Sequence, residues 1–281
     1  MKNQNRHFVI MAVASVLMVL SCLSQGWAAA TPLNGPRGLA LDAKGNLYVA
    51  NQNSSQVLVY NPNYVQQTKK SIAAGVSQPV GVAFDSTGNI YVANQGSQSI
   101  TQYSSAGVQN AKFSITNGID NPWAIAVDAL GDLYVSNNFT NITVYQISDA
   151  NTPMLKTITP GVTTYGITVH GSVIIAGSVN EWVIGYASEM LAGVGGFFGE
   201  GYADEALALT SDSAGNFYVA NATGEVDRWG ALGGGAILQL AFSPEGIAAD
   251  LARERVYVSN QNGNQVLVYS TSNGALLHTI Q

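Results

Sequence analysis

A segment of about 43 residues recurs along this chain of 281 residues. Each copy pairs a stretch of the type Pro-x-Gly-h-Ala-h-Asp with one of the type Gly-Asn-h-Tyr-Val-Ala-Asn, where h is an apolar residue. A repeat of this length indicates a stack or ring of units, because one unit alone cannot bury its apolar faces. The copies centre on positions 43, 43, 40, 44 and 39 residues apart, namely Tyr48, Tyr91, Tyr134, Ile174, Tyr218 and Tyr257.

Each copy has the pattern of four short strands. Apolar residues alternate in the first stretch, an Asp-x-x-Gly turn follows, and the Tyr-Val-Ala stretch returns antiparallel. A third apolar stretch ends in an aromatic residue, as in Val57–Tyr60, and a more polar fourth precedes the next proline, as in Lys112–Ile115. Because propeller blades have this composition and length, we predict an all-β, six-bladed β-propeller with four antiparallel strands per blade.

The repeats resemble NHL repeats and the related YVTN repeats. The resemblance rests on the stretches at residues 36–51, 79–94, 122–137 and 212–221 and on the last copy, residues 244–280. It covers five of the six copies and implies one closed propeller domain over residues 31–281. It implies no single function, because propellers of this kind include lactonases, lyases, electron carriers and binding modules.

The first 30 residues have the features of a secretory signal peptide. Lys2 and Arg6 precede an uncharged apolar run, Phe8–Leu20, and Ala28–Ala30 supplies small residues for cleavage. The run is shorter than the roughly 20 apolar residues of a membrane span, so we expect no transmembrane helix. We predict a secreted or periplasmic bacterial protein. The alternative is a lipoprotein anchored at the cell envelope through Cys22, the only cysteine.

The charge of the remaining chain limits its partners. Residues 1–30 contain two of the 11 basic residues and none of the 17 acidic ones, so residues 31–281 have a formal net charge of −8. Such a surface repels phosphates, which argues against a nucleic-acid partner. Charged residues make up only 10% of the chain, as expected where blades pack on both faces. We expect a monomer.

A ligand of such a propeller is expected at one mouth of the central channel. The Pro-x-Gly starts and the loops after Tyr-Val-Ala-Asn share this face. The recurring Asp and Asn residues fit structural roles in turns and strand ends. Residues that depart from the repeat are more informative, because the scaffold does not require them. In the loops these are Gln52, Gln95, Asn138, Phe139, Glu181, Trp182 and Gln261, and at the strand starts Arg37, Val80, Trp123, Tyr165 and Glu245.

From these we select five candidate ligand-binding residues: Arg37, Trp123, Tyr165, Trp182 and Glu245. Aromatic rings stack on sugars and apolar groups, while amides pair with hydroxyls or peptide groups. The leading hypothesis is a noncatalytic propeller that binds a carbohydrate, a peptide or an envelope protein. Ordinary loop residues without a ligand are the alternative interpretation, and a scaffold within a surface assembly is a third possibility.

An enzyme would need a specific set of residues. The streptogramin-lyase-like relatives use histidines and a metal, but His170 and His278 fall in different kinds of strand. The gluconolactonase-like relatives place a metal-binding Glu where Glu245 stands. We predict no catalytic residue and no cofactor. The open alternative is a metal-dependent lactonase or hydrolase, with Glu245 as a ligand of a divalent cation.

Overall fold

The computed structural model describes residues 30–147, 154–159, 163–170, 173–178, 180–187, 196–204, 206–230 and 233–281. The predicted signal peptide and Cys22 lie outside the described residues. Among these residues, no helix is long and apolar enough to cross a membrane.

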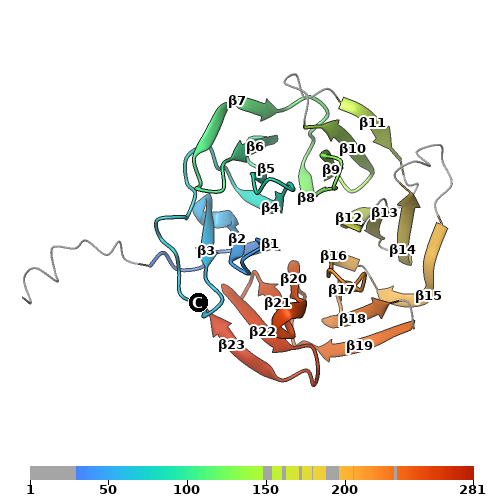
Figure 1. Ribbon diagram of the computed structural model, residues 1–281. Coiled ribbons are helices and arrows are strands. Elements are labelled where there is room, and N and C mark those ends of the chain that lie inside the picture. Colours follow the sequence, from blue (N-terminus) through green and yellow to red (C-terminus); the bar gives the residue numbers. More distant parts are fainter. Residues whose placement is uncertain are drawn as a thin grey trace, which may run out of the picture. The chain divides into compact units, whose positions relative to one another are not determined.

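The residues from Pro32 onward form one unit built from antiparallel sheets. In every sheet the strands follow one another in chain order, and the sheets are arranged around a central axis with their first strands innermost (Figure 1). The fold is therefore a β-propeller. The first sheet contains β1 (Pro36–Leu41), β2 (Leu47–Asn51) and β3 (Gln56–Tyr60).

The other sheets each contain four strands. They are β4 (Pro79–Phe84), β5 (Ile90–Asn94), β6 (Ser99–Tyr103) and β7 (Gln109–Ile115); β8 (Pro122–Val127), β9 (Asp132–Asn137), β10 (Asn141–Gln146) and β11 (Met154–Ile158); β12 (Thr164–His170), β13 (Val173–Ser178), β14 (Asn180–Ala187) and β15 (Gly196–Asp204); β16 (Ala206–Ser211), β17 (Phe217–Asn221), β18 (Glu225–Gly230) and β19 (Gly233–Gln239); and β20 (Gly246–Asp250), β21 (Arg255–Asn260), β22 (Gln265–Ser270) and β23 (Leu276–Ile280). Two 3-10 turns are η1 (Gln52–Ser54) and η3 (Leu251–Arg253).

The predicted fold class, a six-bladed propeller with four antiparallel strands in each blade, is wrong. Five blades have four strands, and the sheet β1–β2–β3 has three. Residues 61–78, which follow β3, make only isolated bridges to it. The reason is local: the Asn61 side chain accepts hydrogen bonds from the backbone N–H groups of Asn63 and Val65, and Tyr64 has a φ of 65°. The chain therefore turns where a fourth strand would extend.

The core lies between neighbouring blades. The second strands β2, β5, β9, β17 and β21 are buried along most of their length, and their repeated tyrosines pack against the next sheet. Tyr91, Tyr134 and Tyr218 each donate a hydrogen bond to the carboxylate of the preceding turn, at 3.0–3.1 Å. The tyrosine column is thus accounted for by packing and by turn anchoring.

Candidate functional site

The central channel is narrow because its walls are backbone. The glycines of the Pro-x-Gly stretches stand where the first strands come closest. A Cβ at Gly38 would collide with the carbonyl oxygen of Val80, and one at Gly246 with that of Arg37. A cavity of about 60 Å³ remains along the axis, lined by residues of the first strands of all the blades. Since a water molecule occupies about 30 Å³, the channel has room for only a few waters. A larger ligand would have to bind outside it.

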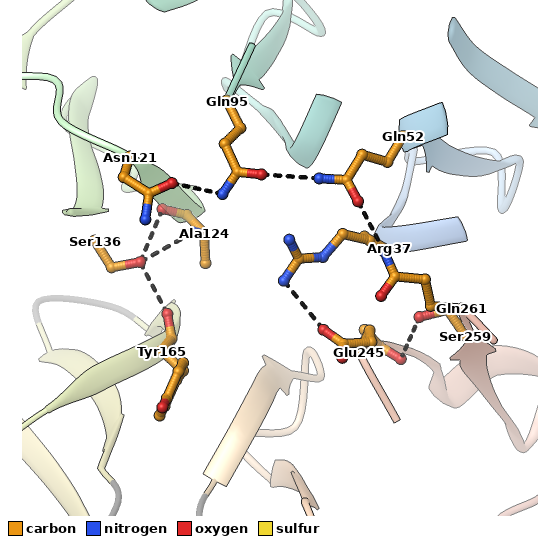
Figure 2. Close-up of polar contacts among 11 residues, drawn as sticks. Arg37, Gln52, Gln95, Asn121, Ala124, Ser136, Tyr165, Glu245, Ser259 and Gln261 are labelled. Carbon is orange, nitrogen blue, oxygen red and sulfur yellow. Dashed lines mark hydrogen bonds and ion pairs between the residues drawn. The ribbon is translucent and has the colours of Figure 1, made fainter. Parts of the chain in front are cut away.

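Arg37 and Glu245 join the first and last blades at the channel mouth, the face where the first strands begin. Arg37 Nη2 lies 3.1 Å from Glu245 Oε2 (Figure 2). The Arg37 side chain is almost fully buried, and its residue is 5% exposed. Burial lowers the pKa of the Arg37 guanidinium, and the attraction and hydrogen bond of Glu245 act in the opposite direction. The mouth therefore contains a charge-neutral pair of a buried guanidinium and a half-buried carboxylate.

Trp123, Phe139 and Tyr165 form a cluster beside this pair, here named the aromatic trio. Their ring centroids are 4.8–5.3 Å apart, with edge-to-face or tilted geometry. The Arg37 guanidinium carbon lies 3.8 Å from the centroid of the Trp123 ring, which is a cation–π contact. All three aromatic residues are half-buried.

The trio is held by backbone bonds between two neighbouring blades. Ser136 Oγ donates to the Tyr165 carbonyl at 2.8 Å and accepts from the Ala124 N–H at 2.9 Å (Figure 2). The Thr164 N–H donates to the Phe139 carbonyl at 2.8 Å. These contacts fix β8, β9 and β12 around the cluster, so the rings are positioned before any ligand arrives.

Phe139 reaches the trio through an unusual turn. It follows Asn138 in the tight connection between β9 and β10, and φ is 44° at Asn138 and 59° at Phe139. Two consecutive positive φ angles are typical of a type I′ turn, in which glycine rather than a bulky residue is favoured at the second position. Backbone strain of this kind concentrates at functional sites.

Four side-chain amides form a second feature of the mouth, here named the amide arc. Gln261 donates to Gln52 at 2.7 Å, Gln52 donates to Gln95 at 2.9 Å, and Gln95 donates to Asn121 at 2.7 Å (Figure 2). All four residues are half-buried. The arc thus runs from the last blade across the first two to the start of β8, where Asn121 precedes Pro122 and Trp123.

A family model for the NHL repeat matches residues 33–60, which contain β1, β2 and β3. The chain is a β-propeller in which this stretch matches the NHL repeat.

Known structures share the fold of this propeller. A streptogramin B lyase is 14% identical with a TM-score of 0.65, over 90% of this chain and 84% of that one. A chain from a nidogen/laminin complex is 13% identical with a TM-score of 0.66, over 88% and 93%. A virginiamycin B lyase from Staphylococcus aureus is 12% identical with a TM-score of 0.62, over 88% and 86%. No curated protein matches the sequence. At these identities the likeness concerns the fold alone.

The recurring polar residues of the propeller bond within their own turns and strand ends. Asp42, Asp85, Asp128 and Asp212 accept backbone N–H groups within their own turns, which confirms the predicted turn-capping role. The buried strand-end asparagines bond to neighbouring backbone: Asn51, Asn94 and Asn137 each accept an N–H from the segment before their own blade. None of these side chains is directed to a ligand.

Four of the five predicted site residues come together at the mouth: Arg37, Trp123, Tyr165 and Glu245. Trp182 lies in β14, and its side chain is outside the described part of the structure. Phe139 and the glutamines of the amide arc were named from the sequence as mouth residues but were not among the five selected candidates, and Asn121 was not named. Two features of the sequence indicate these residues. One is an aromatic residue at a turn position that favours glycine, and the other is an amide residue at the equivalent loop position of three different blades.

The geometry gives a metal site little support. Glu245 is bonded to a buried guanidinium, which a cation would have to displace. His170 packs edge-on against Phe217, while His278 stacks on Tyr64 with ring centroids 4.2 Å apart. Within the described ranges, no group of three or more His, Cys, Asp or Glu side chains could hold a metal ion.

Proposed function

We propose that this propeller is an exported, noncatalytic binding protein whose ligand is a neutral carbohydrate held at the channel mouth. The observation that carries the proposal is the joining of the aromatic trio to the amide arc on one face. Aromatic rings contact the apolar faces of sugars, and amides pair with their hydroxyl groups. Export is inferred from the signal-peptide features of residues 1–30.

Charge at the mouth supports a neutral ligand. Arg37 and Glu245 neutralise each other, and the amide arc has no formal charge. Phosphate or sulfate groups would lack an unpaired cation there, and a cationic ligand would lack an unpaired carboxylate. Peptides and envelope proteins remain the other partners to be tested, and binding to them in place of sugars would overturn the proposal.

Replacement of Trp123 by Ala tests the site. We expect loss of the indole to weaken binding of a neutral glycan about tenfold or more, because the indole is the largest ring of the trio and contacts both other rings. Binding is measured on a glycan array and then by calorimetry with a glycan that binds. Leu130→Ala is the matched control: Leu130 is 76% exposed and lies in the turn at the opposite end of β8.

A second variant separates binding from folding. Phe139→Gly removes a half-buried ring but also relieves the positive φ of 59°. Relief of roughly 1–3 kcal/mol of backbone strain offsets the lost packing, so the unfolding temperature should stay within about 4 °C of wild type. Glycan binding should nevertheless fall. Unchanged glycan affinity in both Trp123→Ala and Phe139→Gly would refute the site.

A further inference from the structure

The amide arc has a direction. In each of its three hydrogen bonds, the amide nearer Gln261 donates and the amide nearer Asn121 accepts. A primary amide offers two N–H donors and an oxygen with two lone pairs. Each inner member, Gln52 and Gln95, therefore uses one donor and one acceptor within the arc and keeps one of each for another partner. Because their neighbours hold them, these groups are already oriented.

Arg37 lies near the centre of the mouth, where it is bonded to Glu245 (Figure 2). Its guanidinium carbon lies 3.8 Å from the centroid of the Trp123 ring. The channel below has room for only about 60 Å³. A ligand that contacts several members of the arc must therefore extend along it, over successive blades.

One end of the arc meets the aromatic trio. Asn121 accepts the hydrogen bond of Gln95 with its side chain, and its backbone carbonyl accepts the N–H of Asn138 at 3.2 Å. Asn121, Asn138 and Phe139 all have positive φ angles, of 43°, 44° and 59°. Positive φ angles also occur in other loops of this face, at Ser55, Gln78, Gln98 and Asn264. It is the bond from Asn138 to Asn121 that joins the end of the arc to the turn of Phe139, so the two features form one surface.

We propose that the ligand is a linear oligosaccharide, with one sugar against the aromatic trio and the following sugars along the amide arc toward Gln261. This inference rests on the proposed carbohydrate-binding function and adds to it the length and orientation of the ligand. The trio supplies the main apolar contact, and the free donors and acceptors of Gln95 and Gln52 meet the hydroxyls of the next sugars.

Glycans of increasing length test this inference. The probes are neutral β-1,4-glucan, α-1,4-glucan, β-1,4-mannan and β-1,4-linked N-acetylglucosamine chains of one to six sugars, titrated into the full chain. We expect the affinity for one series to rise with each sugar up to three or four sugars and then to level off. Each added contact should contribute about three- to tenfold, as one net hydrogen bond does.

Variants assign the length dependence to the arc. Gln52→Ala should lower the affinity for a four-sugar chain about three- to tenfold and leave the affinity for a single sugar unchanged. Gln146→Ala is the control, because Gln146 is an exposed amide that pairs in β10 with Asp132, away from the mouth. Unfolding temperatures of both variants show whether the fold is retained.

The outcomes are distinguishable. If the wild-type protein binds glycans of every length with equal affinity, and Trp123→Ala still abolishes that binding, the linear-ligand inference alone is overturned. An equal loss for one and four sugars in Gln52→Ala would also overturn it, since the arc would then act only by supporting the trio. No binding of any of these glycans would overturn both this inference and the proposed function.

Discussion

Asp227 stands where two other blades have threonine. Asn94 donates to Thr101 at 2.9 Å and Asn137 donates to Thr143 at 2.8 Å, whereas Asn221 donates to the Asp227 carboxylate at 3.0 Å. Asp227 is 2% exposed. Burial raises the pKa of its carboxyl to about 6, and the nearby negative charge of Glu225 adds to this effect. This blade therefore contains a carboxyl that titrates near neutral pH.

Asp227→Thr should stabilise the protein about twice as much at pH 8 as at pH 5. The folded-state pKa is raised, so the folded protein binds the proton more tightly than the unfolded chain, and its stability falls as pH rises from about 4 to about 6. The variant removes a burial penalty on the order of 3 kcal/mol present at pH 8. Urea unfolding at the two pH values measures the difference.

The reciprocal variant is the control for this effect. Thr143→Asp should make the stability of the protein fall with rising pH in the same way, because Thr143 accepts the equivalent bond from Asn137. An equal stability difference at pH 5 and pH 8 for Asp227→Thr would show that shape, not charge, governs the position.

Sequence reasoning at the residue scale succeeded where a residue departed from the repeat at a known position. Arg37, Trp123, Tyr165 and Glu245 were selected in this way, and the structure brings them together. The three glutamines of the amide arc were named as mouth residues, but their hydrogen bonds were not predicted, because these bonds join side chains of successive blades. The direction of each bond depends on how far apart neighbouring blades lie, and an alignment of the repeats does not contain this distance.

The first blade differs from the others at the scale of the element. Residues 61–78 take the place of a fourth strand, and Ile72 bridges to Val57 through two backbone hydrogen bonds of 2.8 Å. The same segment contacts the last blade: Tyr64 stacks on His278, and Arg255 donates to the Pro62 carbonyl at 3.0 Å. The segment thus covers the edge of β3 and helps to close the ring.

Ile72→Ala should destabilise the protein by about 2–4 kcal/mol, because Ile72 is 2% exposed and fills the core beneath β3. Val65→Ala in the same segment should change stability by less than about 0.5 kcal/mol, because Val65 is 57% exposed. Urea unfolding of both variants at one pH provides the comparison. A small effect of Ile72→Ala would mean that this segment is not part of the core.

Inner strands were easier to predict than outer ones. The first two strands of a blade alternate apolar residues between two packed sheets, so their pattern is strict. Outer positions are partly exposed and constrained less, as in β11 and β23. The inner strands dominate the repeat pattern. This pattern therefore could not predict that the first blade lacks a fourth strand.

In the propeller as a whole, no sheet formed by the described strands contains strands from both the first and the last blade. Side chains and loops join the first and last blades instead. At the mouth these contacts are the Arg37–Glu245 pair, the Gln261–Gln52 bond and the Gly35 N–H donated to Asn264 at 2.7 Å. Ring closure and the candidate site therefore share residues, and a ligand that spans the arc would also hold the first and last blades together.

A crystal structure of the full chain with the oligosaccharide that binds best would show directly whether the ligand lies across the aromatic trio and the amide arc. We predict one sugar ring against Trp123, Phe139 and Tyr165, further sugars along the amide arc, and an intact Arg37–Glu245 pair beneath them. Sugar bound on the opposite face, among the Asp-x-x-Gly turns, or on the outer strands would contradict the proposed binding site at the channel mouth.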